Sequence, residues 1–317
     1  MNKKRGRKIT LIKGIDPRAS KIDKVKHVFK ELRERWRDIY WWKIETSHYI
    51  LQFYYGIIRG NGGIYVVKEN WDTLIILDAC RYDVLREVMG GDIDYRVSRG
   101  SSTLEWVREN FTDRKHDDIV YVTANPWVNR LAADSFHRII PVWKDGWDDN
   151  LDTVNPKTMT EYAKKAAKEY PDKRLIIHYM QPHQPYIVEK YSLSAIMSVD
   201  YMRPKEITRQ LERGNYGLLA VWDAYKRSLE ATLPHVFSLI SELKGRTVIS
   251  ADHGELFSKK VLIFTLKSGH YWGIHVPELI KVPWVVFEGE ERKQTEEGDE
   301  KERLKRKIRA LKGLGKT

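Results

Sequence analysis

The hydrophobic pattern of the chain changes character near residue 64. Between about residues 20 and 58, charged and aromatic residues alternate at helical spacing, which predicts an accessory helical segment. From residue 71 onward, short apolar runs bounded by polar residues recur, as expected of strands buried on both faces. These runs occupy residues 73–79, 119–125, 137–143, 174–180, 247–253 and 283–287.

Helical periodicity fills several of the intervals between these runs, notably at residues 157–170 and 215–243. Strands that alternate with helices indicate a mostly parallel sheet with helices on both faces. We therefore predict an α/β domain at residues 61–290. The Gly-rich turn RGNGGI at residues 59–64 leads into it, because Gly supplies the backbone freedom that a change of direction needs.

Three further parts complete the predicted organisation. Residues 1–18 form a basic, flexible arm, and residues 19–60 form the aromatic helical segment. We interpret its rings as packing onto the α/β domain. The alternative is an interfacial membrane helix, because Trp and Tyr suit the headgroup level. Residues 291–317 are mostly charged, which predicts a solvated tail with a short helix; a polyanion-binding helix is the alternative.

Composition narrows the class of partner without choosing one. The 317 residues carry a formal net charge of +12, which favours polyanions such as nucleic acids, anionic lipids and phosphorylated or sulfated sugars. The single cysteine, Cys80, excludes an intramolecular disulfide framework and a Cys-based zinc site. The sequence predicts no signal peptide and no membrane span, so we expect a cytoplasmic protein. The pattern specifies no oligomeric state.

Polar side chains end several of the predicted strands, where the crevice of an open α/β sheet lies. Asp78 ends the run TLIIL, where a carboxylate is costly without a metal or a cationic partner. The alternative is that Asp78 caps a helix beginning near Arg81. Asp252 and His253 end the run TVISA and precede Gly254. Their adjacent oxygen and nitrogen donors suit Zn²⁺, Mn²⁺ or a similar ion.

Four histidines lie in two further segments. His178 and His183 belong to HYMQPHQPY, where two prolines stiffen the turn, and His270 and His275 belong to GHYWGIH. A fixed imidazole is able to hold an anionic oxygen or to protonate a leaving group. Each histidine alone is more often a structural residue, but their joint placement at strand ends favours a functional site.

Together these segments resemble the alkaline phosphatase superfamily, particularly its sulfatase-like branch of arylsulfatases, lipoteichoic acid synthases and phosphoethanolamine transferases. The resemblance runs from about Trp71 to Phe287. TLIILDACRYD looks like the strand whose terminal Asp binds the metal, SADHGE looks like the Asp-His-Gly metal motif, and HYMQPHQPY looks like the PHxPY turn. GHYWGIHVPELIKVPWVVF resembles the closing segment, in which a His precedes a glutamate and a strand beginning with VP.

The resemblance implies a nucleophile between the first and second of these motifs. SRGSSTLEW fits that place, with Thr103 as the first choice and Ser102 and Ser101 as alternatives. A Ser/Thr-rich turn that caps the helix LEWVREN is the structural alternative. Cys80 lies beside the metal Asp, and no Cys-x-Pro-Ser-Arg occurs. A formylglycine nucleophile, and with it a conventional sulfatase activity, therefore loses support.

The resemblance also implies one divalent ion, which is zinc, manganese, magnesium or calcium, with a second ion as an open alternative. The expected ligands are Asp78, Thr103, Asp252 and His253. No second ligand set is assignable, because the acidic and histidine side chains of the later helical stretch fit helix packing better; these are Asp223, Glu230 and His235.

The remaining site residues are expected to handle the substrate. His183, assisted by His178 or His270, would bind the non-bridging oxygens or protonate the leaving oxygen. Arg99, Asn125 and His275 would line the substrate pocket. The structural alternatives are a surface ion pair for Arg99 and a turn for Asn125.

We therefore predict a metal-dependent hydrolase or transferase that acts on phosphate esters through Thr103, with sulfate esters less favoured. The expected partner is an anionic ester carried by a glycan or a lipid. Peripheral contact with a membrane surface is an option, and nucleic acid is a weaker candidate. Two alternatives stay open. One is a sulfatase-like sulfuric ester hydrolase, and the other is a non-catalytic polyanion-binding protein on the same fold, whose binding would depend steeply on salt.

Overall fold

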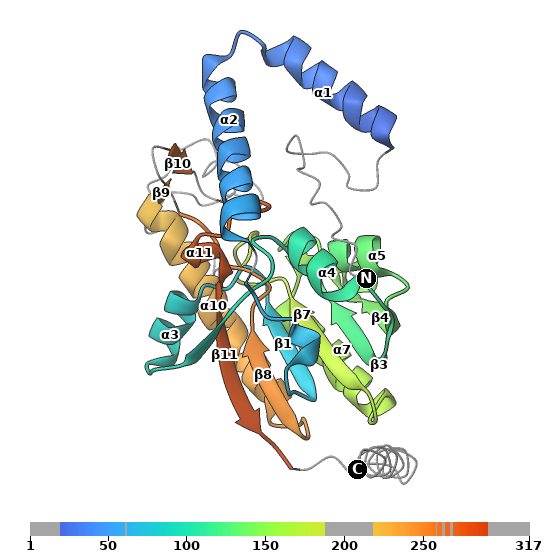
Figure 1. Ribbon diagram of the computed structural model, residues 1–317. Coiled ribbons are helices and arrows are strands. Elements are labelled where there is room, and N and C mark those ends of the chain that lie inside the picture. The colour runs from blue at the N-terminus through green and yellow to red at the C-terminus, as the bar shows by residue number, and fades with distance from the viewer. Residues whose placement is uncertain are drawn as a thin grey trace, which may run out of the picture.

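A seven-stranded sheet, in the order β2-β11-β8-β1-β7-β3-β4, forms the centre of the computed structural model (Figure 1). The structure describes residues 20–60, 62–187, 218–257, 259–261, 264–266 and 269–290. The predicted arm at 1–18 and the predicted tail at 291–317 lie outside the described residues, as does the start of the predicted helix at 215–243.

Five neighbouring strands of the sheet run parallel. They are β8 (Arg246–Ser250), β1 (Thr73–Leu77), β7 (Arg174–Tyr179), β3 (His116–Thr123) and β4 (Phe136–Pro141). β11 (Lys281–Glu288) joins β8 antiparallel, and β2 (Asp94–Val97) pairs antiparallel with β11 at the edge. The mostly parallel sheet is confirmed. β2 was not predicted, because its four residues are exposed or half-buried and carry no apolar run.

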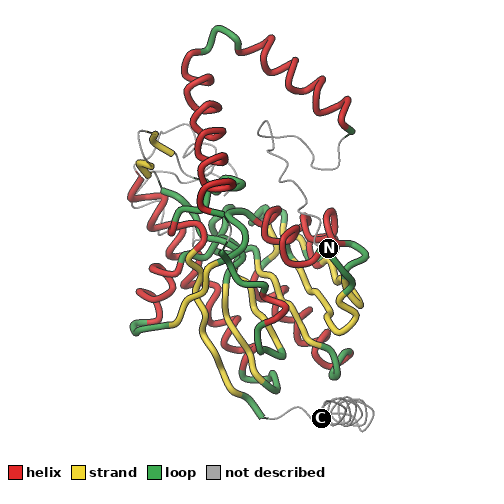
Figure 2. Tube along the Cα trace, in the orientation of Figure 1, coloured by secondary structure: helices red, strands yellow, loops and turns green. Residues whose placement is uncertain are grey.

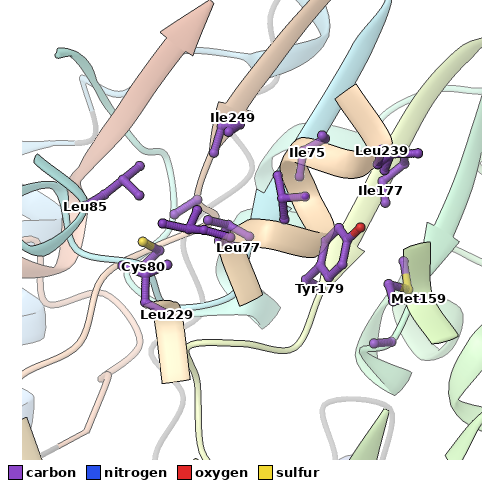
Figure 3. Packing of buried hydrophobic residues seen from close by; sticks show 14 of the residues in the cluster. Ile75, Leu77, Cys80, Leu85, Met159, Ile177, Tyr179, Leu229, Leu239 and Ile249 are labelled. Atoms are coloured by element: carbon purple, nitrogen blue, oxygen red, sulfur yellow. The ribbon is translucent and has the colours of Figure 1, made fainter. Parts of the chain in front are cut away.

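Alternate side chains of the central strand β1 enter two separate hydrophobic clusters, since successive strand residues point to opposite faces. Ile75 and Leu77 pack with α3 (Tyr82–Met89), α7 (Pro156–Glu169) and α10 (Leu218–Ile240) (Figure 3). Leu74 and Ile76 pack with α4 (Thr103–Phe111) and α5 (Pro126–Ala132). Both faces are covered by helices, which explains why the strand sequences are apolar without alternation.

Smaller elements complete the domain. They are η2 (Val66–Lys68), α6 (Val142–Asp145), the pair β5 (Trp147–Asp148) and β6 (Thr153–Val154), the pair β9 (Lys259–Val261) and β10 (Phe264–Leu266), and α11 (Pro277–Ile280).

The N-terminal segment is helical, as predicted, and stands out from the α/β domain (Figures 1 and 2). It contains α1 (Lys21–Arg35), α2 (Ile39–Phe53) and the π-helix η1 (Tyr54–Arg59). Leu51 of α2 is fully buried in a cluster with Leu256, Ile274, Val276 and Leu279. The end of α2 is thus docked on the domain. Within the described residues, no helix combines the length and the apolar character that crossing a membrane requires.

Candidate active site

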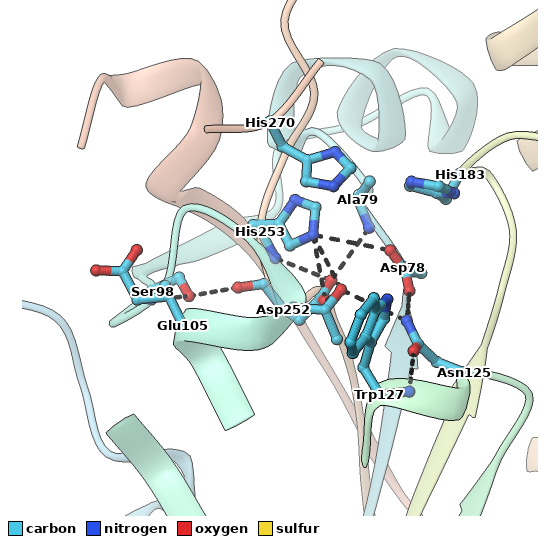
Figure 4. A network of polar contacts seen from close by, with 12 residues as sticks. Asp78, Ala79, Ser98, Glu105, Asn125, Trp127, His183, Asp252, His253 and His270 are labelled. Carbon is cyan, nitrogen blue, oxygen red and sulfur yellow. Dashed lines mark hydrogen bonds and ion pairs between the residues drawn. The ribbon is translucent and has the colours of Figure 1, made fainter. Parts of the chain in front are cut away.

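The carboxyl ends of the parallel strands bring the predicted site residues together (Figure 4). Asp78 follows β1, and Asp252 and His253 lie just beyond the neighbouring strand β8. Asn125 follows β3, and Thr103 is the first residue of α4. All five side chains are buried.

One carboxylate oxygen of Asp78 accepts a hydrogen bond, and the other has no hydrogen-bond partner among the described residues. Its Oδ2 accepts a hydrogen bond of 2.6 Å from Asn125 Nδ2 and lies 3.3 Å from His178 Nε2. Its Oδ1 has no hydrogen-bond partner among the described residues and lies 3.8 Å from His253 Nε2. Burial raises the pKa of Asp78, but the hydrogen bond from His178 and the charges of nearby histidines outweigh it and hold the pKa below its ordinary value. Asp78 is therefore an ionised carboxylate, and Arg81, not Asp78, occupies the N-cap position of α3.

His253 presents a nitrogen lone pair to the same place. Its Nδ1 donates to the carbonyl oxygen of Gly254 at 2.7 Å, which leaves Nε2 as the acceptor. Burial lowers the pKa of His253 despite the nearby charge of Asp252, so the neutral imidazole is favoured. A Cβ atom at position 254 would collide with the carbonyl oxygen of Glu278, so glycine is needed for the chain to pass there.

The turn after Asp78 has a strained backbone conformation that hydrogen bonds from neighbouring side chains stabilise. Ala79 has φ 58°, a region that non-glycine residues rarely adopt. Its N–H donates to Asp252 Oδ1 at 3.1 Å, and its carbonyl oxygen accepts from the Tyr225 hydroxyl at 2.7 Å. The same hydroxyl accepts from the backbone N–H of Arg81 at 2.8 Å. Tyr225 on α10 and Asp252 thus fix the direction in which Asp78 points.

Thr103 is the hydroxyl residue that reaches the acidic cluster. Its Oγ1 donates to Asp252 Oδ2 at 2.7 Å and lies 3.2 Å from His253 Nε2 and 3.5 Å from Asn125 Nδ2. Ser102 is at the N-cap of α4, yet its side chain makes no capping hydrogen bond. Ser102 therefore does not cap α4 through its side chain.

Ser101 is engaged elsewhere. Its Oγ contacts Glu105 Oε2 and the carbonyl oxygen of Tyr271, both at 2.8 Å. Glu105 also pairs with His275 Nε2 at 3.0 Å, which ties the start of α4 to the segment carrying the last two predicted histidines. Burial raises the pKa of Glu105, but the hydrogen bond and charge of His275 outweigh it and lower the pKa.

A second group of possible metal ligands lies beside the first. His183, Glu255 and His270 each offer one donor atom, and these atoms lie within 4.8 Å of one another. The His253 and His270 ring centroids are 4.5 Å apart, and His270 Nδ1 lies 3.2 Å from Glu255 Oε2. Burial lowers the pKa of His270, but the carboxylate of Glu255 raises it more.

Glu255 is the site residue that the sequence interpretation missed. It is buried, and its Oε1 has no hydrogen-bond partner among the described residues. The available signal was its place in Asp252-His253-Gly254-Glu255, immediately after the metal motif. The residues considered for a second set lie instead on α10, where Asp223 pairs with Arg227. Glu230 on the same helix is exposed.

The first group fits a divalent ion by its donor chemistry. Asp78, Asp252 and His253 offer two carboxylate oxygens and one imidazole nitrogen within 4.8 Å of one another. Such a mixed set suits zinc or manganese. The open Asp78 Oδ1 is a buried charged atom that lacks a donor among the described residues, as expected of a ligand for a cation.

The other predicted residues occupy distinct positions. His178 is fully buried in β7, and its Nδ1 contacts the Tyr121 hydroxyl at 2.9 Å. Asn125 contacts Asp78 and also caps α5, because its Oδ1 accepts from the backbone N–H of Trp127.

The Arg99 guanidinium makes several contacts with neighbouring residues. It donates to the carbonyl oxygen of Gly63 at 2.7 Å and lies 3.9 Å from the Tyr65 ring centroid. It also lies 3.6 Å from Glu109. The contact with Glu109 is an ion pair, as in the structural alternative for Arg99, while contact with substrate stays a prediction.

A pocket of about 350 Å³ lies next to the site. Arg81 in its wall donates to the carbonyl oxygen of Glu255 at 3.0 Å, and Leu256 in its wall is the next residue along the chain. The other lining residues are Leu218, Leu219, Trp222, Phe257, Lys259 and Glu278.

Comparison with protein-family models and with curated protein sequences gives no match. Solved structures do match. Lipooligosaccharide phosphoethanolamine transferase A from Neisseria meningitidis, an integral membrane protein, is 12% identical with a TM-score of 0.50, over 68% of this chain and 47% of that chain. This chain therefore spans about half the length of that protein.

Two further solved structures match more distantly. The zinc complex of the periplasmic domain of EcEptC from Escherichia coli is 12% identical with a TM-score of 0.45, over 69% of this chain and 72% of that one. A protein in the alkaline phosphatase superfamily from Vibrio parahaemolyticus is 12% identical with a TM-score of 0.39, over 70% and 60%. With the parallel sheet and the order of the site segments, the chain has the alkaline phosphatase/sulfatase-like fold.

Proposed function

We propose that this protein is a metal-dependent enzyme that hydrolyses or transfers a phosphate ester, with Thr103 as the nucleophile. The observation that supports this most is the position of Thr103 Oγ1, 2.7 Å from Asp252 Oδ2 and 3.2 Å from His253 Nε2. A buried hydroxyl between a carboxylate and an imidazole is placed for deprotonation and attack.

Asp78, Asp252 and His253, with the Thr103 hydroxyl, are the proposed ligands of one divalent ion. When bound there, such an ion lowers the pKa of a hydroxyl and neutralises charge on phosphate oxygens. The group of His183, Glu255 and His270 supports two alternatives. Either it holds a second ion, or its side chains bind the phosphate oxygens directly.

In the first half-reaction, Thr103 Oγ1 forms a bond to phosphorus while the bond from phosphorus to the leaving oxygen breaks. Asp252 Oδ2 accepts the hydroxyl proton, since the two atoms are already hydrogen-bonded. His183 or His270 donates a proton to the leaving oxygen. The N-terminus of α4 adds partial positive charge beside the phosphate.

In the second half-reaction, water or an acceptor alcohol attacks phosphorus and gives its proton to the histidine that lost one in the first. Thr103 Oγ1 leaves and takes its proton back from Asp252 Oδ2. His178 has a supporting part in this proposal, because it is buried against Asp78 and holds the carboxylate in its ionised form. Asn125 orients the other side of the same carboxylate oxygen.

Phosphate is favoured over sulfate because the nucleophile position holds a threonine. The thiol of Cys80 is buried in the turn after Asp78, and burial raises its pKa, so it is an inert side chain. The proposed substrate is an anionic ester that a lipid or a glycan carries. The cytoplasmic location stays a prediction, and the matching domain from Escherichia coli is described as periplasmic.

Hydrolysis of an aryl phosphate, a bis-aryl phosphate and an aryl sulfate, each with and without added Zn²⁺ or Mn²⁺, tests the proposal. We expect metal-dependent turnover of a phosphate ester that falls about a thousandfold or more in Thr103→Ala and in Asp252→Asn. Mass spectrometry of protein quenched during turnover should find phosphate on the peptide that contains Thr103.

Thr112→Ala is a matched control, because Thr112 is an exposed threonine at the opposite end of α4. Ser102→Ala tests the neighbouring hydroxyl. Both should keep turnover. Full activity in Thr103→Ala, or loss of activity in Ser102→Ala alone, would contradict the assignment of the nucleophile.

A further inference from the structure

Large apolar side chains are exposed mainly on the N-terminal helices. Of the fourteen large hydrophobic residues exposed among the described residues, eight lie between residues 20 and 60. We call these eight the N-terminal apolar stripe: Ile22, Val25, Phe29, Trp36, Ile39, Trp42, Ile50 and Phe53. Scattered exposed hydrophobic residues are ordinary, but a concentration of them marks an interaction surface.

The stripe follows helical spacing. In α1, Ile22, Val25 and Phe29 are three and four residues apart, so they share one face. In α2, the exposed positions Ile39, Trp42, Ile50 and Phe53 also share a face. The stripe therefore runs along both helices.

The opposite face of α2 is already used. Leu51 is fully buried against the domain, and Ser47, one turn earlier, is also buried. Residues two apart in a helix point in different directions, so Leu51 and Phe53 cannot serve the same contact. A helix that is apolar on two faces, with one face covered, has a second surface for a partner.

Formal charge concentrates in the same part of the chain. The first 60 residues contain 16 Lys and Arg against 6 Asp and Glu, which accounts for +10 of the net charge of +12. An apolar stripe with Trp and Phe, within a sequence segment rich in Lys and Arg, has the composition that binds at the interface of an anionic bilayer.

We propose that the N-terminal apolar stripe docks side-on onto an anionic lipid surface. A second copy of this chain is a poorer occupant, because it would bring the same positive charge to the contact. A bare polyanion such as nucleic acid satisfies the charge but leaves Ile39, Trp42 and Phe53 exposed to water.

Docking at this surface has a geometric consequence for the candidate site. The end of α2 packs on the segment that follows His270, with the His48 and Tyr271 ring centroids 4.6 Å apart. α2 and α1 rise from the end of the sheet at which Asp78 and Asp252 lie (Figure 1). The segment that carries the stripe is therefore attached to the domain next to the candidate site.

Vesicle flotation of the full chain tests the docking surface, using vesicles of phosphatidylcholine alone and of phosphatidylcholine mixed equally with phosphatidylglycerol. The test variant is Ile39→Ser with Trp42→Ser, whose side chains are 85% and 42% exposed. The matched control is Leu219→Ser with Trp147→Ser, whose side chains are 84% and 43% exposed but lie outside the stripe.

We expect the wild type and the control variant to float with the mixed vesicles and much less with phosphatidylcholine alone. The stripe variant should lose about tenfold or more of its vesicle partition. Far-ultraviolet circular dichroism checks that each variant is folded. Flotation is independent of turnover, so it stands apart from the fate of the proposed reaction.

Four results would overturn the proposal. They are absence of wild-type flotation, undiminished flotation of the stripe variant, equal loss in the control variant, and flotation that ignores lipid charge. A stripe-dependent dimer in sedimentation experiments without vesicle binding would assign the surface to a second copy instead.

Discussion

The Asn125 side chain contacts both the N-terminus of α5 and the candidate site. Its Oδ1 caps α5 through the N–H of Trp127, while its Nδ2 donates to Asp78. The sequence offered a turn and a pocket residue as alternatives. The structure shows the helix cap and the contact with Asp78, while contact with substrate stays a prediction. Glu255 is the converse case, since it lies directly after Gly254 in the sequence but groups with His183 and His270 in the structure. A linear motif does not reveal which side chains turn inward.

His116 leads to a prediction at the residue scale that is independent of the site. It is buried beside Phe111 and Phe136, and burial lowers its pKa below the ordinary 6.5, with a further contribution from Arg114. The unfolded chain therefore binds the proton more readily, so stability is present above pH 6.5 and is lost as the pH falls toward the folded pKa.

We expect the free energy of unfolding, measured with urea, to fall more for the wild type than for His116→Leu between about pH 7.5 and about pH 5. The reason is that the variant lacks the group whose protonation favours the unfolded chain. Identical pH slopes for the two proteins would show that His116 is not the titrating group.

At the scale of elements, α4 couples two parts of the site. Glu105 in its first turn accepts from the N–H of Ser101 at 2.9 Å and from the N–H of Gly273 at 3.1 Å. Its other oxygen pairs with His275, so one buried carboxylate joins the nucleophile turn to the loop after His270. His275 is thus held by a carboxylate in the structure, while its predicted contact with substrate stays a prediction.

Glu105→Gln should weaken the contact between the nucleophile turn and the loop after His270. Four donor groups point at the Glu105 carboxylate, and the amide of glutamine replaces one of its two acceptor oxygens with an NH₂ donor. We expect a stability loss of about 1–3 kcal/mol. Turnover of the phosphate ester should fall about ten- to a hundredfold, as the Thr103 hydroxyl shifts relative to His270.

Glu109→Gln, one turn further along α4, is the control, and its partly exposed pair with Arg99 is worth about 1 kcal/mol or less. Chemical unfolding and steady-state kinetics measure both variants. Equal effects of the two substitutions on turnover would remove the special role of Glu105. Restored turnover in Glu105→Asp with a shifted pH profile would support it.

Six of the seven strands of the central sheet were predictable, and the edge strand β2 was not. The runs at β1, β7 and β8 are apolar because helices cover both faces, and that pattern is visible in a sequence. β4, at the other edge, is only partly buried but still has the apolar pair Ile139 and Ile140. β2 pairs with β11 through backbone hydrogen bonds, and its side chains are exposed or half-buried. Its sequence therefore shows no hydrophobic run. The direction of β11 depends on contacts far along the chain, which periodicity does not encode.

In the molecule as a whole, the net positive charge and the candidate site residues lie in different parts of the chain. The first 60 residues carry nearly all of the net positive charge, while the acidic and histidine side chains of the site gather at the carboxyl ends of β1 and β8. The polar residues at the ends of the predicted strands indicated where the site would lie. It did not predict that α2 would have one buried and one exposed apolar face, because both faces look alike in sequence.

The proposed reaction depends on a divalent ion that Asp78, Asp252 and His253 hold beside Thr103. Anomalous diffraction from crystals grown with Zn²⁺ or Mn²⁺, compared between the wild type and Asp252→Asn, tests it most directly. We expect a peak in contact with Asp78, Asp252, His253 and the Thr103 hydroxyl that is absent in the variant, and any second peak should lie among His183, Glu255 and His270. A wild-type crystal with no peak beside Asp252, or with its ion bound elsewhere, would contradict the account.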